Sequence, residues 1–234
     1  IDEFPQVIQE FHAVSNFPGV VGAIDCTYIK IQSPGGNRAE IYRNRKGYFS
    51  INVQVISDAN LRIRNVTARW PGSVHDSTIF NNSHIRAQFE MGRVNEGLLL
   101  GDSGYPLRNL TPYLHPETRG QHNYNTAHIR TRNCVERMIG VWKRLSLGLR
   151  TKRETTLTII VATAVLHNIA IETMDELPPE NLPLYRFIQE RRMRNDRIQN
   201  RVPIQVEDEA TALAYRNAIA QHFDCEYYFH FNIK

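Results

Sequence analysis

Cysteine is scarce in this chain of 234 residues. Its three cysteines, Cys26, Cys134 and Cys225, are too few and too scattered for a disulfide scaffold or a cysteine-based zinc site. Long apolar runs are also lacking, because residues 157–171 are interrupted by polar side chains and fall short of the roughly 20 residues that a bilayer requires. The chain opens without an initiator methionine or a basic-then-apolar leader, as an excised fragment would. We expect a protein of a reducing compartment with no membrane partner.

The composition is that of a folded domain. With 41% hydrophobic, 22% charged and 9% aromatic residues, the chain is neither collagen-like, low-complexity nor wholly disordered. The net charge of +4 is local, since six arginines face only Glu190 and Asp196 within residues 185–201 and the rest of the chain is neutral in sum. Such a cluster indicates either a solvated helix face or tail, or contact with nucleic acid, including a nuclear import signal.

Apolar periodicity and turn residues predict an α/β fold with a mixed sheet flanked by helices. Residues 19–68 have the alternation of a three-stranded meander, and residues 97–101 form a short apolar run typical of a central strand. Helices are expected over residues 6–15, 76–89, 131–145, 157–171 (buried) and 209–223, with a surface loop over residues 106–128.

Two aspartates stand where carboxylates are costly. Asp25 and Asp102 each directly follow an apolar strand, which is unfavourable unless the side chain is paired, hydrogen-bonded or bound to a metal. Either one alone would more often be a turn former or a helix cap. Glu136 lies on a predicted helix with Arg132 one turn before it and Lys143 two turns after it. That stripe is either an exposed ion-paired face or a metal ligand beside a bound phosphodiester.

Oxygen ligands from Asp and Glu favour a hard cation, Mg²⁺ or Mn²⁺. Two such ions about 3.5–4 Å apart can activate an attacking water or 3′-hydroxyl and stabilise the leaving oxygen of an in-line phosphoryl displacement. Three or four carboxylates are what such a pair of ions needs.

Six sequence blocks occur in an order that is specific when taken together. They are Gly19-Val-Val-Gly-Ala-Ile-Asp-Cys-Thr-Tyr-Ile29, Tyr42-Arg-Asn-Arg-Lys-Gly47 with Ser50-Ile-Asn-Val-Gln54, Pro71-Gly-Ser-Val-His-Asp-Ser77, Gly101-Asp-Ser-Gly-Tyr-Pro106, Val135-Glu-Arg137 with Gly140 and Lys143, and Leu166-His-Asn168. Over residues 17–172 the chain resembles the DDE endonuclease domain of PIF/Harbinger transposases and of the transposase-derived nucleases related to them.

The resemblance implies a ribonuclease H-like fold in which Asp25, Asp102 and Glu136 are the catalytic, metal-binding carboxylates. Asp76 is implied as a further metal ligand, and its other interpretation is a helix N-cap. Related bacterial transposases carry a Tyr-(2)-Arg-(3)-Glu-(6)-Lys signature, which Arg132, Glu136 and Lys143 fit; Ile129 replaces its tyrosine.

The predicted organisation is a stub helix over residues 1–16, the nuclease domain over residues 17–176 and an arginine-rich helical extension over residues 177–234. The function expected first is a divalent-metal-dependent DNA endonuclease. The alternatives are a domesticated DNA- or protein-binding module without strand cleavage, and a Mg²⁺-dependent phosphatase, which leaves the arginine-rich segments unexplained. The family further suggests a location in the nucleus, with the cytoplasm as the alternative, a homodimer, and a Myb/SANT-like partner protein.

A basic segment separates the first two predicted strands. The functional interpretation is that it neutralises DNA backbone phosphates near the carboxylates, and the other is ordinary surface charge. Within it stand Arg38, Arg43, Arg45 and Lys46, and we expect Arg43, Arg45 and Lys46 to bind DNA together with Arg132 and Lys143.

Overall fold

The sheet has four strands in the order β3-β2-β1-β4. The computed structural model describes residues 4–92, 94, 97–105, 111–142, 149–173 and 209–231. Strands β1 (Val20–Lys30), β2 (Ser50–Ser57) and β3 (Ile63–Pro71) form an antiparallel meander, and β4 (Leu98–Leu100) lies parallel to β1. The predicted α/β class with a mixed, helix-flanked sheet is confirmed, and the arrangement is consistent with a ribonuclease H-like nuclease fold.

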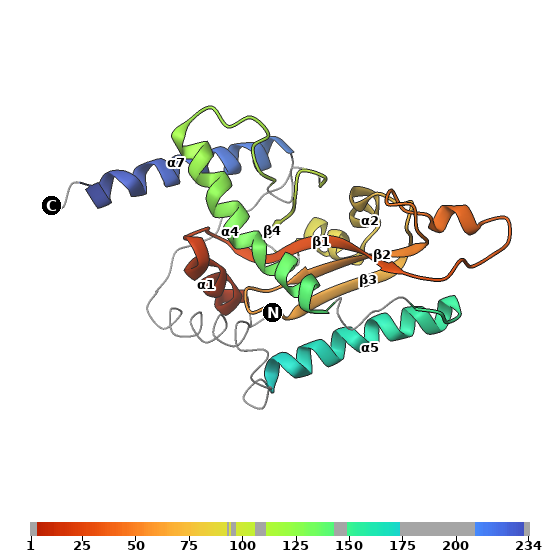
Figure 1. Ribbon diagram of the computed structural model, residues 1–234. Coiled ribbons are helices and arrows are strands. Elements are labelled where there is room, and N and C mark those ends of the chain that lie inside the picture. The colour runs from red at the N-terminus through yellow and green to blue at the C-terminus, as the bar shows by residue number, and fades with distance from the viewer. Residues whose placement is uncertain are drawn as a thin grey trace.

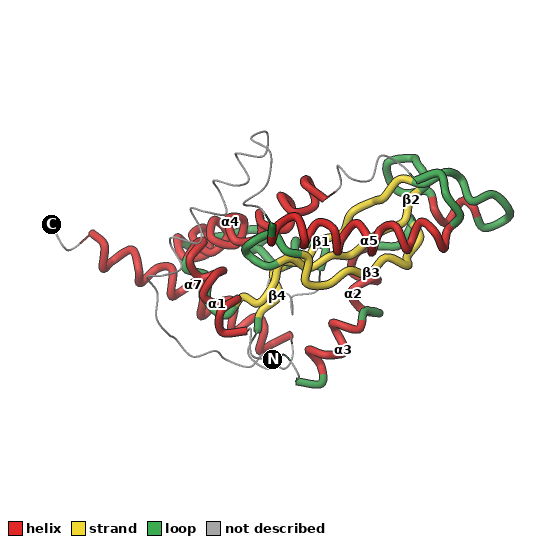
Figure 2. The backbone as a smooth tube through the Cα atoms, turned by 90° about the horizontal axis from the view of Figure 1, so that it is seen from below, coloured by secondary structure: helices red, strands yellow, loops and turns green. Residues whose placement is uncertain are grey.

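Helices cover both faces of this sheet (Figures 1 and 2). On one side lie α1 (Phe4–Ser15), α4 (Arg119–Trp142) and α5 (Arg153–Glu172). On the other side lie the short helices α2 (Asp76–Asn81) and α3 (His84–Glu90). Helix α7 (Glu209–Phe231), from the predicted C-terminal extension, packs across α4. A short 3₁₀ helix, η1 (Ala39–Tyr42), interrupts the connection from β1 to β2.

The two faces carry different cores because side chains alternate along a strand. From β2, Ile51, Val53 and Val55 join the large cluster that α4 and α5 complete. The next residue, Ile56, points to the other face, where it packs with Phe80 in a smaller cluster. A polar side chain on the sheet therefore faces either the large cluster under α4 and α5 or the smaller cluster with Phe80, depending on its position in the strand.

The helix predicted over residues 76–89 is two helices. Ser83 ends the first and begins the second, since its hydroxyl donates to the carbonyl of Phe80 at 2.7 Å and accepts the N–H of Arg86 at 3.3 Å. A serine that caps a new helix in this way competes with continuation of the preceding one. The prediction of a single helix was wrong for that reason.

Helix α4 begins at Arg119, inside the region predicted as a loop over residues 106–128. Thr118 and Gln121 form a capping box. The Thr118 hydroxyl accepts the N–H of Gln121 at 3.2 Å, while the Gln121 side chain accepts the N–H of Thr118 at 3.4 Å and that of Glu117 at 2.7 Å. The Thr-x-x-Gln signal is present in the sequence, and the polar composition of the segment hid it.

Helix α5 is only partly buried, contrary to the prediction of a buried helix. Its inner face packs near β3, whereas its outer face exposes a row of apolar side chains. The exposed residues are Val161, Val165, Leu166 and Ile169. By length and composition alone this helix could also cross a membrane, which for a single helix is weak evidence.

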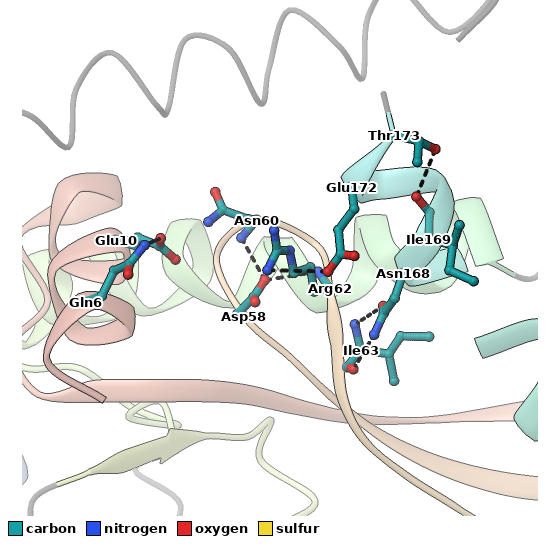
Figure 3. A network of polar contacts seen from close by, with 10 residues as sticks. All are labelled: Gln6, Glu10, Asp58, Asn60, Arg62, Ile63, Asn168, Ile169, Glu172 and Thr173. Atoms are coloured by element: carbon teal, nitrogen blue, oxygen red, sulfur yellow. Dashed lines mark hydrogen bonds and ion pairs between the residues drawn. The ribbon is translucent and has the colours of Figure 1, made fainter. Parts of the chain in front are cut away.

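Two polar side chains attach α5 to the strands. The imidazole Nε2 of His167 lies 2.8 Å from the carbonyl oxygen of Leu61. The side-chain amide of Asn168 bonds to both backbone groups of Ile63 (Figure 3). The turn that they hold is organised by Asp58, whose carboxylate accepts the N–H groups of Asn60 and Arg62, each at 2.9 Å.

Candidate functional site

Asp25 lies midway along β1, on the face that α4 covers. Its neighbour Cys26 points to the opposite face, against the smaller core. One carboxylate oxygen of Asp25 accepts the N–H of Cys26 at 2.8 Å, and the other lies 2.9 Å from Nη2 of Arg132 on α4. The ion pair with Arg132 of α4 therefore holds the carboxylate of Asp25, which follows the apolar first half of β1.

Arg132 joins two of the predicted carboxylates. Its Nη1 donates to Oε1 of Glu136 at 2.6 Å, one turn further along α4, while its Nη2 holds Asp25. The side chain of Arg132 is 12% exposed and that of Glu136 is 56% exposed. One largely buried guanidinium thus bridges a carboxylate from the sheet and a carboxylate from the helix.

Asp102 follows β4 in a tight turn. Its side chain accepts the N–H of Gly104 at 2.9 Å, and its backbone carbonyl accepts the N–H of Tyr105 at 3.1 Å. Gly101 leaves room for this turn, because a Cβ there would meet the ring of Tyr105 at 3.0 Å. Since β4 lies parallel to β1 and Ala23 pairs with Leu100, Asp102 emerges beside the middle of β1.

The electrostatics of Asp25 tie these residues together. The pKa of its carboxyl is raised to about 6, with burial as the largest cause and the negative charges of Asp102 and Glu136 contributing to the rise. The guanidinium of Arg132 and the N–H of Cys26 oppose this shift in pKa. The carboxylates of Asp102 and Glu136, from the turn after β4 and from α4, therefore both act on the buried carboxylate of Asp25 on β1.

Asp76 lies on the other face of the sheet, in the first turn of α2. Its carboxylate accepts a hydrogen bond of 2.9 Å from the side-chain amide of Asn52 on β2. His75, not Asp76, holds the N-cap position, and its side chain makes no capping bond. Burial raises the pKa of the Cys26 thiol, and Asp76 raises it further. The structure thus brings Asp76 to the side chain of Cys26, and to Asp25 only through the strand between them.

The basic segment after β1 is ordered by a buried asparagine. The side chain of Asn44 donates to the hydroxyl of Ser50 and accepts the N–H of Lys46, both at 2.9 Å. Arg43 is committed within the segment, because it pairs with Glu40 at 2.7 Å. Arg45 and Lys46 are exposed.

The electrostatics of Tyr28 show which groups lie near Arg45. Burial raises the pKa of Tyr28, Asp76 raises it further, and Arg45 opposes the shift, so all three groups lie near one another. The segment therefore borders the Asp76 side of β1. Lys143 and the arginine-rich residues 185–201 lie outside the described residues.

Sequence reasoning assigned no role to Asn44, Asn52 or Tyr105. Each belongs to one of the six blocks quoted above, and each supports a site residue or the basic segment. The hydroxyl of Tyr105 lies 3.2 Å from the sulfur of Cys26, and both residues belong to the smaller core cluster on that face of β1. Their occurrence within the blocks could have marked these residues as important, but the sequence does not show which groups they contact.

Comparison with known proteins shows the family to which the chain belongs. The family model "DDE superfamily endonuclease" matches residues 24–168, and the chain belongs to this family. It is 37% identical over 172 residues to the putative nuclease HARBI1 of Rattus norvegicus and 30% identical over 177 residues to that of Xenopus laevis, in each case over 70% of this chain and 49% of the relative. It is 28% identical over 193 residues to Protein ALP1-like of Arabidopsis thaliana, over 73% of this chain and 48% of the relative.

The predicted resemblance to Harbinger transposase-derived nucleases is confirmed by these matches. No solved structure matches the chain. The chain spans about half the length of the curated relatives it matches.

The carboxylates suit a divalent cation, although within the described ranges no three acidic, histidine or cysteine side chains stand close enough to form a ready-made metal cage. Asp25 and Glu136 both form ion pairs with the guanidinium of Arg132, and the negative charge of Asp102 contributes to the raised pKa of Asp25. An all-carboxylate donor set matches a hard cation such as Mg²⁺ or Mn²⁺.

Proposed function

We propose that this chain is the divalent-metal-dependent DNA endonuclease domain of a Harbinger-type transposase or transposase-derived nuclease, which cleaves phosphodiester bonds by two-metal in-line displacement. The supporting observation is that Arg132 on α4 contacts both Asp25 on β1 and Glu136, while the charge of Asp102, in the turn after β4, also acts on Asp25. Burial of a carboxylate among like charges is unfavourable for folding, which is typical of a site kept for chemistry.

Asp25, Asp102 and Glu136 would hold the cations. Asp76, also expected as a ligand, is held by Asn52 on the other face of the sheet, so it would act beside this set rather than within it. A pair of such ions, when bound, supplies an activated attacking oxygen and stabilises the leaving oxygen. The chain's own contribution is rigid placement. Asp25 is fixed by the strand and by the N–H of Cys26, and Asp102 by its turn, whereas Glu136 is largely exposed and can adjust.

DNA is the proposed substrate. Arg45 and Lys46 present exposed charge at one end of β1, and we propose that they bind backbone phosphates together with Arg43, Arg132 and Lys143. Contacts of this type give affinity and register without sequence information. The proposal also includes action in the nucleus, assembly as a homodimer, and recruitment by a Myb/SANT-like DNA-binding protein.

Relaxation of supercoiled plasmid tests the proposed activity. We expect cleavage by the wild-type chain with Mg²⁺ or Mn²⁺, none with EDTA, and none by Asp102→Asn with metal. Asp58→Asn is the control, because it makes the same change at an aspartate that lies at the β2–β3 turn, away from the proposed site. It should cleave like the wild type. Metal-independent cleavage, or full activity of Asp102→Asn, would contradict the proposal.

A further inference from the structure

We propose that Arg132 is a built-in counter-cation that competes with the divalent metal for Asp25 and Glu136. In the metal-free protein its guanidinium neutralises both carboxylates, and it must release at least one of them when a cation binds. This inference rests on the proposed function, because it concerns the same carboxylates. It assigns to Arg132 a role in metal affinity, separate from any contact with DNA.

The geometry supports an exchangeable cation. The two ends of one guanidinium contact two carboxylates, Asp25 at 2.9 Å and Glu136 at 2.6 Å. Those are the oxygens that a metal would need, since the remaining oxygen of Asp25 is held by the N–H of Cys26. Arg132 therefore occupies ligand atoms rather than a neighbouring position.

The bonding of Arg132 is also incomplete. Its buried Nε has no hydrogen-bond partner among the described residues. An unpaired buried donor is costly, so the hydrogen bonds of Arg132 to the two carboxylates leave its side chain only partly satisfied. The side chain of Glu136 is about half exposed, so it can move toward solvent and break its ion pair with Arg132.

Competition follows from charge. A carboxylate oxygen engaged by a guanidinium has lost an acceptor position, and the fixed positive charge repels an approaching dication over a few ångströms in a poorly solvated site. Removal of Arg132 should therefore have opposite effects on two quantities. It should lower the stability of the metal-free protein, because Asp25 is left buried beside other carboxylates, and it should tighten metal binding.

The test measures Mn²⁺ affinity and melting temperature of the full chain, using the electron paramagnetic resonance signal of free Mn²⁺. We expect Arg132→Gln to melt at a lower temperature without metal and to bind Mn²⁺ about tenfold more tightly than the wild type. Arg132→Lys keeps the charge but loses the two-pronged contact, so its affinity should lie between the two. Arg130→Gln, an exposed arginine on the same helix, should change neither quantity.

The outcomes separate this inference from the proposed function. A folded Arg132→Gln that binds Mn²⁺ no more tightly than the wild type overturns the competition and leaves the metal site standing. If Arg132→Gln does not fold, Arg132→Lys decides, and unchanged or weaker Mn²⁺ binding by it overturns the inference. Failure of every variant and of the wild type to bind Mn²⁺ contradicts the inference and the proposed metal dependence together.

Discussion

The side-chain amide of Asn168 pairs with the backbone of Ile63 as a neighbouring strand would, accepting its N–H at 2.8 Å and donating to its carbonyl at 2.9 Å. Next to it, His167 bonds to the carbonyl of Leu61. The block Leu166-His-Asn168 therefore attaches α5 to the edge of the sheet (Figure 3). Its role in the described structure is to hold α5 on the sheet, whereas the blocks that contain Asp25 and Asp102 supply proposed metal ligands.

Replacing Asn168 with alanine should destabilise the fold without touching the site. Two backbone groups of Ile63 would lose their partners where the residue is buried, so we expect the free energy of unfolding to fall by about 2–3 kcal/mol. Urea denaturation measures this loss. Asn82→Ala, which removes an exposed side-chain amide that donates to the carbonyl of Thr78, is the control and should cost far less. Equal losses would show that the strand-like pairing is not important.

Much of the fold could be predicted because its signals are local. Period-two alternation identifies β2, and an apolar run followed by Asp102 marks β4. Three details escaped. The break at Ser83 and the start of α4 at Thr118 depend on individual capping side chains, and the open face of α5 depends on what packs beside it.

The site was predictable in part for the same reason. An acidic residue directly after an apolar run is visible in the sequence, and this singles out Asp25, which lies midway along β1, and Asp102, which follows β4. The ion pair between Asp25 and Arg132 joins residues far apart in the chain, so no local pattern reports it. The face on which Asp76 lies is likewise a tertiary property, since it depends on where α2 crosses the sheet.

The exposed charges of the basic segment should contribute to DNA affinity through phosphates. For Arg45→Ala/Lys46→Ala we expect weaker binding to duplex DNA and a log-affinity versus log-salt slope that is smaller in magnitude by about 0.9 for each lost phosphate contact. Binding titrations across a salt series measure both quantities. The fold should be unaffected, because Asn44 and not these side chains orders the segment.

Arg64→Ala/Arg119→Ala is the control for this experiment. It removes the same charge from exposed positions on β3 and at the start of α4. This variant should keep the wild-type slope. If both double variants lose affinity equally, general attraction explains the binding; if Arg45→Ala/Lys46→Ala binds like the wild type, the segment is not on the DNA path.

The pH dependence of stability should carry a contribution from Asp58. Burial raises the pKa of its carboxyl to about 6, although the N–H groups of Arg62 and Asn60 oppose the shift. Between the unfolded pKa of 3.8 and about 6 the folded chain holds a proton that the unfolded chain does not, so protonation stabilises the fold as the pH falls through 6. This contribution is lost as the pH rises through about 6 and is complete only below the unfolded pKa of 3.8.

Comparison with Asp58→Asn isolates that contribution, because the other titrating groups cancel. We expect the free energy of unfolding of the wild type to rise relative to that of the variant by about 2 kcal/mol between pH 7.5 and 4.5. Urea denaturation at several pH values measures the difference. A difference that stays constant with pH would mean that the carboxyl of Asp58 titrates normally in the folded protein.

The convergence of three carboxylates on one cation is the central claim, and anomalous diffraction from crystals grown with Mn²⁺ tests it most directly. The account predicts Mn²⁺ bound by side-chain oxygens of Asp25, Asp102 and Glu136, with the guanidinium of Arg132 withdrawn from at least one of them. Crystals of Asp25→Asn, an isosteric change that removes one anionic ligand, should show weaker or no Mn²⁺ density there. Mn²⁺ bound elsewhere, with Arg132 still bridging Asp25 and Glu136 in the wild type, would contradict the account.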